Sequence, residues 1–142
     1  MSDKILYRTE ATATGGSVGQ STTTDGKIDV TLATPKELGG AGGAGVNPEQ
    51  LFAVGYAACF LGAMKFAAAK DKVMLPAEPK VTADVGIGSR DDEQGFGLDV
   101  ELKISLPGLD AETADKVIHG GDVVCPYSHA IKGRVNVKLT RI

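Results

Sequence analysis

Apolar and polar residues alternate along several stretches of the chain, which is the pattern of strands with one buried face. The clearest stretch is residues 27–34 (KIDVTLAT), where every second residue is apolar. Asp25 and Gly26, just before it, have the composition of a hairpin turn, so the N-terminal strands are expected to form an antiparallel meander. The strands predicted in this way are residues 5–14, 20–24, 27–34, 80–87, 96–106 and 135–139.

A long helix is predicted to begin at Pro48. Asn47 is a good helix cap, Pro48 suits the first helical position, and Glu49 places an acceptor near free backbone N–H groups. A second helix is predicted at residues 110–124, because Pro126 cannot continue it. Strands grouped before and after a central helix indicate the α+β class.

The first predicted helix runs to about Lys70, and its residues 51–64 carry no charge. Lys65 interrupts this run before the roughly 18 apolar residues that indicate a membrane span, so a core helix is expected. A helix that is apolar all round needs protein on every side, which a second copy of the chain would help to supply. Small residues would permit close helix packing on parts of its surface, namely Gly55, Ala58, Gly62 and Ala63.

Composition and charge limit the possible functions. A chain of 142 residues fits a single domain, residues 1–142, and 42% hydrophobic residues is ordinary for a globular protein. The net charge is -3 and no run of lysine and arginine is present, so nucleic acid is not expected as a partner. Residues 1–8 contain charges and lack the apolar core of a secretory signal, so a cytoplasmic location is expected.

Two patterns suggest bound groups, and neither holds. Residues 40–45 (GAGGAG) match the dinucleotide fingerprint G-x-G-x-x-G, but residues 35–39 separate them from the preceding strand and the helix starts after the last glycine. The segment is interpreted as a connecting loop. His119 and His129, taken with the two cysteines, do not have the spacing of a zinc site. No bound cofactor and no metal are expected.

The two cysteines, Cys59 and Cys125, are the candidate reactive groups. In a reducing cytosol they are better explained as free or redox-active thiols than as a permanent disulfide. Each alone is also compatible with a small buried apolar residue, although the proline after Cys125 is expected to expose its sulfur. As a pair they suffice for a peroxidase cycle, in which one thiolate becomes a sulfenic acid and the other condenses with it to a disulfide.

The residues around both cysteines resemble the organic hydroperoxide resistance (Ohr) branch of the Ohr/OsmC family. The resemblance is carried by residues 47–60 (NPEQLFAVGYAACF) and 124–128 (VCPYS). It continues in order along nearly the whole chain through five shorter matches: ATGG at 13–16, LGG at 38–40, LPAE at 75–78, VGIG at 85–88 and GFGL at 95–98.

The resemblance implies an OsmC-like fold, with antiparallel sheets around a long central helix, in an intertwined homodimer. It implies a peroxidase that reduces organic and fatty-acid hydroperoxides to alcohols and is itself reduced by an external dithiol, the lipoyl group of a lipoylated protein. The family's peroxidatic and resolving cysteines correspond to Cys59 and Cys125, and its active-site glutamate corresponds to Glu49. Tyr127 and Ser128 are candidates for positioning Cys125.

The chain departs from the family pattern at Ser17, where the family has an arginine that pairs with the reactive thiolate and with the glutamate. An adjacent cation lowers the pKa of a thiol from its usual value of about 8.5, so its loss is expected to slow the reaction. The alternative function is a weakly catalytic or non-catalytic relative that binds an apolar ligand or senses oxidants. Three other arginines are candidates for the missing charge: Arg8, Arg90 and Arg134.

Helix geometry also constrains Glu49 and Cys59. Ten residues at a rise of about 1.5 Å place them about 15 Å apart along a straight helix, so they cannot touch within it. If both belong to one active site, as the resemblance implies, either the glutamate comes from the other subunit or the helix bends sharply. Four aromatic residues on this helix are expected in the core, where some would line an apolar channel for an alkyl hydroperoxide: Phe52, Tyr56, Phe60 and Phe66.

Overall fold

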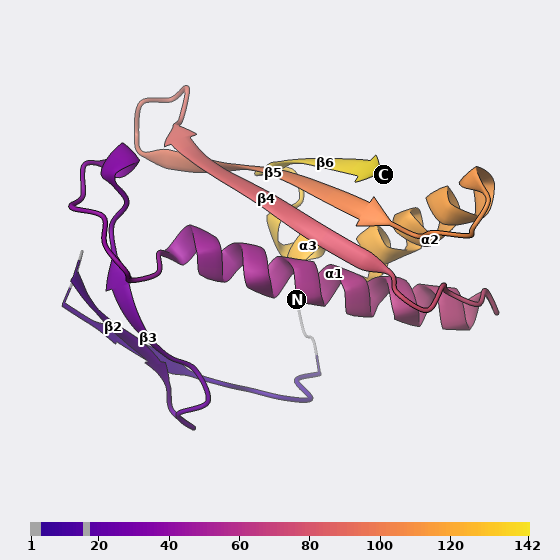
Figure 1. Cartoon of the computed structure of the whole chain (residues 1–142), viewed down its shortest axis with the longest axis horizontal. Helices are drawn as coiled ribbons and strands as arrows, with labels where there is room; N and C mark the ends of the chain where they lie inside the picture. The colour runs from indigo at the N-terminus through magenta and orange to yellow at the C-terminus, as the bar shows by residue number, and fades with distance from the viewer. Residues whose placement is uncertain (1–3, 16–17) are drawn as a thin grey trace. The chain divides into compact units, whose positions relative to one another are not determined.

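The computed structural model describes residues 4–15 and 18–142 of the chain (Figure 1). Ser17, the position of the family arginine, lies outside the described residues. The chain divides into two compact units, Met1–Pro48 and Glu49–Ile142, and each is described by itself. Strands and helices are both present in the predicted order, so the α+β class is confirmed.

The first unit holds an antiparallel sheet with strand order β1-β2-β3. Its strands are β1 (Ala11–Thr14), β2 (Val18–Thr23) and β3 (Asp29–Ala33). The predicted turn is confirmed, since Gly26 has a φ of 76° and the Asp25 carboxylate accepts the Lys27 backbone N–H at 3.0 Å. The first strand begins at Ala11 rather than at residue 5, because Ala11 pairs with Thr23 and β2 ends there. Residues 5–10 therefore lie outside the sheet.

The glycine-rich segment is a packed connection between β3 and the long helix. After a 3₁₀ turn (η1, Lys36–Leu38) the chain folds back, and Val46 forms a bridge with Leu32. A Cβ atom on Gly40 would lie 2.1 Å from the Thr34 carbonyl oxygen, and one on Gly45 would lie 2.7 Å from the carbonyl carbon of Leu32. These glycines serve close backbone packing. The following helix begins at Pro48, after the last glycine, as predicted.

The second unit contains one sheet, with strand order β4-β5-β6, and three helices. Its elements are α1 (Pro48–Lys70), β4 (Lys80–Ser89), β5 (Phe96–Ser105), α2 (Ala111–Val124), α3 (Pro126–Ile131) and β6 (Asn136–Arg141). The expectation of antiparallel sheets holds for β4 and β5, but β5 and β6 are parallel. The reason is the connection between them, since a crossover through helices returns the chain to the same end of the sheet.

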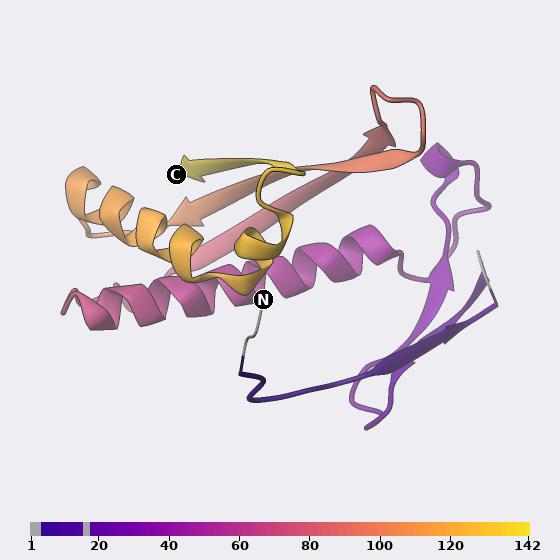
Figure 2. The same cartoon turned by 180° about the vertical axis from the view of Figure 1, so that it is seen from behind.

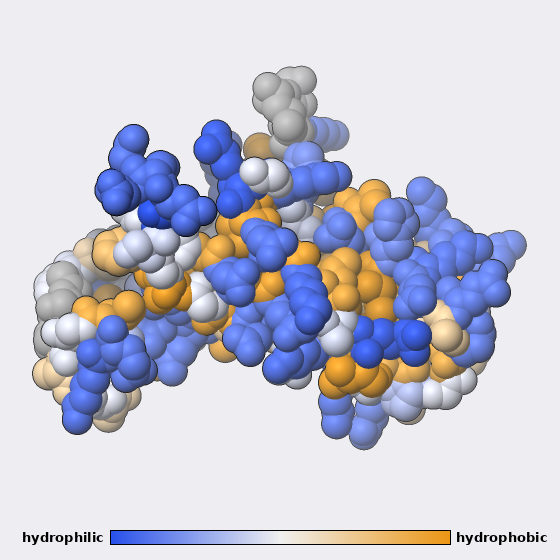
Figure 3. Space-filling view, turned by 90° about the horizontal axis from the view of Figure 1, so that it is seen from above, coloured by the Kyte–Doolittle hydropathy of each residue, from blue (hydrophilic) through white to orange (hydrophobic). Residues whose placement is uncertain are grey.

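The core lies between this sheet and the helices (Figures 1 and 2). On β5, Val100, Leu102 and Ile104 alternate with polar residues and are almost completely buried. They pack in one cluster with Tyr56, Phe60 and Met64 of α1 and with apolar residues of α2. The outer face of the sheet carries ion pairs, and hydrophilic side chains cover much of that side in Figure 3. The unit therefore consists of a sheet layer and a helix layer.

Two glycines allow α2 to lie close to α1. A Cβ atom on Gly120 would lie 2.8 Å from the Cβ of Ala67, and one on Gly121 would lie 2.5 Å from the Cγ of Met64. Both distances are shorter than ordinary carbon–carbon contacts. In the sequence this glycine pair only weakens the predicted helix, whereas in the structure it permits close packing of the two helices.

Within its own unit, residues 49–142, α1 is covered on one face only. Its buried residues are Tyr56, Phe60, Ala63, Met64, Ala67 and Ala68. The opposite side forms an apolar stripe that includes Leu51, Val54, Ala58, Gly62 and Phe66. Val54 is 71% exposed and Phe66 is 64% exposed, so the prediction that Phe66 lies in the core is wrong for the single chain.

By length and composition alone, α1 is apolar enough to cross a membrane, so the charge of Lys65 does not by itself exclude a membrane span. It is the single helix with this property among residues 4–15 and 18–142. One such helix is weak grounds for a membrane span, because the core helix of a globular protein passes the same test. The inner face of α1 packs in the core of its unit, as expected of a core helix.

Replacing Gly120 with alanine should destabilise the protein. The added methyl group would press on the Cβ of Ala67, which cannot rotate away. Overpacking of this kind costs about 1–3 kcal/mol, which exceeds the gain in helix propensity of about 1 kcal/mol. Urea or thermal unfolding measures the effect. Gly88→Ala, where a Cβ would meet nothing within 4 Å, is the matched control, and equal stability of the two variants would contradict the packing argument.

Candidate active site

The structure brings the two cysteine sulfurs into contact. Cys125 Sγ donates a hydrogen bond to Cys59 Sγ at 3.5 Å, although the residues are 66 positions apart in the sequence. Both are free thiols. Cys59 is half-buried on α1, whereas Cys125 has no exposed surface. The expectation that the proline break exposes the Cys125 sulfur is therefore wrong, and Cys59 is the thiol that meets solvent.

Cys125 is the single residue between α2 and α3. The corner between these two helices is visible from behind in Figure 2. The backbone of Cys125 is extended, with φ −64° and ψ 119°. Its N–H donates to the Gly121 carbonyl at 2.8 Å, and its carbonyl accepts from the His129 N–H at 3.0 Å. The predicted stop at Pro126 is confirmed for α2, but the same proline also starts α3. The Cys125 sulfur contacts α1 on the buried side of this corner.

The start of α3 also supplies a hydrogen-bond donor to the reactive sulfur. The backbone N–H of Tyr127 donates to Cys59 Sγ and lowers the pKa of that thiol. This N–H is available because the first N–H groups of a helix have no partner within it. The sequence contained the signal, since a proline at the first helical position leaves the next N–H free. It could not show that Cys59 would lie opposite.

Burial of the Cys59 thiol opposes the effect of the Tyr127 N–H on its pKa, and the effect of burial is the larger of the two. It raises the pKa of the Cys59 thiol above its ordinary value, and the neighbouring Cys125 raises it further. Among the described residues, Tyr127 and Cys125 are the groups that shift this pKa, and neither is a cation. Of the three arginines considered above, Arg90 is paired with Asp92 at 3.1 Å. The described part of the chain therefore keeps Cys59 as a neutral thiol at neutral pH.

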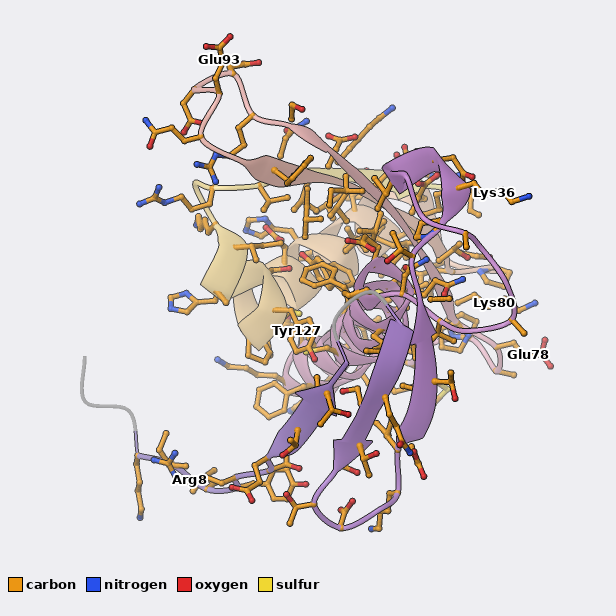
Figure 4. The ribbon with its side chains drawn as sticks, turned by 90° about the vertical axis from the view of Figure 1, so that its left-hand side faces the viewer. Arg8, Lys36, Glu78, Lys80, Glu93 and Tyr127 are labelled. Carbon is orange, nitrogen blue, oxygen red and sulfur yellow. The ribbon has the colours of Figure 1, made fainter. Side chains whose placement is uncertain are left out.

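Aromatic rings lie in the apolar cluster that contains Cys125 and against which Cys59 packs. Phe52 and Tyr56 are in edge-to-face contact at 5.7 Å between ring centroids, and Tyr127 lies 5.9 Å from Tyr56. Figure 4 shows Tyr127 beside α1, where a Cβ atom on Gly55 would lie 3.0 Å from the tyrosine oxygen. Gly55 thus makes room for this ring. Apolar surroundings of this kind suit an alkyl group.

A second polar contact lies next to the sulfurs. The hydroxyl groups of Tyr56 and Ser128 are hydrogen-bonded at 2.6 Å, and both residues are buried. Burial raises the pKa of Tyr56, so its hydroxyl stays protonated at neutral pH. Ser128, which the sequence suggested for positioning Cys125, therefore has a partner on α1 that the sequence did not indicate.

Glu49 is not brought to the sulfurs by a bend in the helix. It lies on the first turn of α1, which runs without interruption from Pro48 to Lys70 (Figure 1). Ten residues of regular helix separate it from Cys59 by about 15 Å. Within one chain, Glu49 therefore lies on the first turn of α1 and Cys59 at its middle, too far apart to touch.

No metal centre is formed by the part of the chain that the structure describes. There, no three or more histidine, cysteine, aspartate or glutamate side chains gather in a way that could hold a metal ion.

Comparison with known proteins identifies the family. Residues 40–140 match the family described as OsmC-like protein. The chain belongs to the OsmC family. This OsmC-family chain is 51% identical over 138 residues to the organic hydroperoxide resistance protein of Xanthomonas axonopodis pv. citri, covering 97% of this chain and 96% of that protein.

Solved structures agree with this assignment. The organic hydroperoxide resistance protein OsmC of Legionella pneumophila has a TM-score of 0.91 at 46% identity, covering 97% of this chain and 98% of that one. An organic hydroperoxide resistance protein from Elizabethkingia anophelis has a TM-score of 0.92 at 44% identity, covering 98% of both chains. The OsmC-like fold and the resemblance to the organic hydroperoxide resistance branch of the OsmC family are confirmed.

The raised pKa of Cys59 predicts how its reactivity depends on pH. A raised pKa means that the reactive thiolate forms only as the pH passes above the usual thiol value of about 8.5. The rate of Cys59 alkylation by iodoacetamide in the reduced protein should therefore rise with a midpoint above that value. Peptide mass mapping at a series of pH values measures it. A midpoint below the usual value would contradict this prediction and would indicate a cation beside the sulfur.

Proposed function

We propose that this OsmC-family chain is a thiol-dependent peroxidase that reduces organic hydroperoxides to alcohols. The observation that carries the proposal is the pair of free thiols 3.5 Å apart, one half-buried and one fully buried. Relatives that match 97% of the chain are named organic hydroperoxide resistance proteins, which supports a role in peroxide resistance.

The proposed cycle assigns a different step to each thiol. The Cys59 thiolate attacks the distal oxygen of the hydroperoxide, the O–O bond breaks, and the leaving alkoxide takes a proton to become the alcohol. Cys59 is then a sulfenic acid. The Cys125 sulfur attacks the Cys59 sulfur, the S–O bond breaks, and the oxygen leaves as water with the proton of Cys125. The exposure of the two sulfurs supports this order, because a peroxide from solvent meets Cys59 first.

The proposed substrates carry an apolar group. Phe52 packs, like Cys59, against the apolar cluster that holds Cys125, and its ring lies 6.2 Å from that of Tyr127; such surroundings favour an alkyl or aryl hydroperoxide over a small polar one. The proposed reductant is an external dithiol such as a lipoyl group, which reduces the disulfide and becomes a disulfide itself. The proposed compartment is the reducing cytoplasm, where such dithiols are kept reduced.

The proposed active form is an intertwined homodimer. The exposed apolar stripe on α1 supports it, since a surface with Val54 and Phe66 largely exposed is unfavourable in water. The position of Glu49 supports it as well, because an uninterrupted α1 keeps this carboxylate from the Cys59 of its own chain. We propose that Glu49 acts at the Cys59 of the other subunit.

A second function is favoured by one observation, the raised pKa of Cys59 with no cation among the described groups that shift it. A thiol that stays neutral reacts slowly with peroxides. The alternative is a weakly catalytic or non-catalytic relative that binds an apolar ligand or senses oxidants, without rapid turnover.

Oxidation of the reduced protein with one equivalent of cumene hydroperoxide tests the peroxidase. The expected products are one equivalent of cumyl alcohol and a protein that has lost both thiols and two hydrogen atoms, measured by intact mass and thiol titration. Cys59→Ser should abolish the reaction, whereas Cys125→Ser should stop at the sulfenic acid.

Wild-type thiols that do not react with cumene hydroperoxide would overturn the proposed peroxidase function. Oxidation that is not followed by repeated turnover with dihydrolipoamide would instead support the oxidant-sensing alternative. Hydrogen peroxide at the same concentration is the control for the apolar substrate preference, and it should react more slowly than cumene hydroperoxide.

Mixed dimers test the assignment of Glu49. If Glu49 acts across the dimer, Glu49→Gln and Cys59→Ser are each impaired alone, but a heterodimer of the two has one site with both residues intact. Activity should therefore reappear on mixing and reach about half of the wild-type value per dimer. Dihydrolipoamide-dependent peroxidase assays of the purified heterodimer measure it. A heterodimer no more active than its parents would place both residues in one chain.

A further inference from the structure

The contact between the Tyr56 and Ser128 hydroxyl groups lies directly beside the sulfur contact. Tyr56 precedes Cys59 by three residues on α1, and Ser128 follows Cys125 by three residues. Residues three apart on a helix lie on the same side of it. The same two segments are therefore joined twice, once by the sulfurs at 3.5 Å and once by the hydroxyls at 2.6 Å.

The segment that carries Cys125 needs such a second contact. Cys125 is the single residue between α2 and α3, with an extended backbone, so a small rotation there moves its sulfur. A disulfide requires the sulfurs to approach from 3.5 Å to about 2.05 Å. The resolving step therefore depends on the backbone conformation at Cys125, which sets the distance between the two sulfurs.

We propose that Tyr56 and Ser128 are positioning residues for the resolving step. Their hydrogen bond holds the start of α3 against α1, so that Cys125 Sγ stays within reach of the Cys59 sulfenic acid. The inference rests on the proposed peroxidase function and concerns its second step. Neither hydroxyl touches the reacting oxygen, and both act through the placement of Cys125.

The chemical consequence is a competition for the sulfenic acid. Cys125 converts it to the disulfide and releases water. A second hydroperoxide instead adds an oxygen to it, giving the sulfinic acid and another alcohol, and this product is not restored by thiols. If the hydrogen bond positions Cys125, its loss slows the first route and leaves the second unchanged.

Single-hydroxyl variants are expected to fold. A pocket of about 170 Å³ is lined by Tyr56 and Ser128 together with Asp122 and Lys132. It is large and polar enough for water to reach a hydroxyl that has lost its partner. Tyr56→Phe and Ser128→Ala each remove only one oxygen atom.

The test is a quenched-flow oxidation followed by intact mass spectrometry. Wild type, Tyr56→Phe and Ser128→Ala are oxidised with increasing cumene hydroperoxide, with Tyr7→Phe and Ser89→Ala as matched controls on exposed residues. Loss of reduced Cys59 should be unchanged in all five proteins. Disulfide formation should slow by about 10- to 100-fold in the two site variants, the usual effect of a misplacement near 1 Å. Their sulfinic acid fraction should rise with hydroperoxide concentration.

A double variant separates positioning from general damage. Because the two hydroxyls form one contact, Tyr56→Phe with Ser128→Ala should resolve no more slowly than either single variant. Additive losses, or an equal slowing of the first step, would overturn the positioning role. Disulfide formation at the wild-type rate in both single variants would also overturn it, while leaving the peroxidase standing. Failure of wild-type Cys59 to be oxidised at all would instead overturn the proposed function and, with it, this inference.

Discussion

The unit Glu49–Ile142 depends on the burial of one face of α1. This helix carries no charge over residues 51–64, and its inner side chains fill the core against β5 and α2. The approach of α2 is set by Gly120 and Gly121, which leave no side chain between the helices. Because Cys125 ends α2, the same close packing determines how near its sulfur lies to Cys59. The packing of the core therefore also determines the geometry of the thiol pair.

The site combines two opposing demands on Cys59. Contact with the buried Cys125 sulfur requires that Cys59 be removed from water, and this burial raises the pKa of the Cys59 thiol. The backbone N–H of Tyr127 offsets part of this cost without adding a charge. The family resemblance implies that an arginine would meet this demand, and this chain has Ser17 at the corresponding position.

Much of the fold was predictable from local signals. The alternation of β5, the Asp25 turn and the start of α1 at Pro48 each follow from a few neighbouring residues. The short α3 was missed because Pro126 was interpreted only as a stop, although proline also favours the first position of a helix. The parallel pairing of β5 with β6 was missed too, yet a predicted helix between two strands is the pattern of a crossover.

The candidate site was predictable only as far as its residue identities. Motifs around Cys59 and Cys125 identified the thiols, but the predicted exposure of Cys125 was wrong, since burial depends on how a corner packs against a distant helix. Tyr56 illustrates the same limit. Its pattern in the sequence is that of a core aromatic residue, and its hydrogen bond to Ser128 appears only when segments 72 residues apart are brought together.

The complete burial of Cys125 has a consequence for the direction of electron flow. In a protein that cycles through a Cys59–Cys125 disulfide, an incoming dithiol can reach only the Cys59 sulfur. The mixed disulfide with the reductant then forms on Cys59, and Cys125 is the leaving group. Oxidant and reductant would thus use the same entrance at different times, and the ease of reduction would be governed by how well the interior tolerates a thiolate on Cys125.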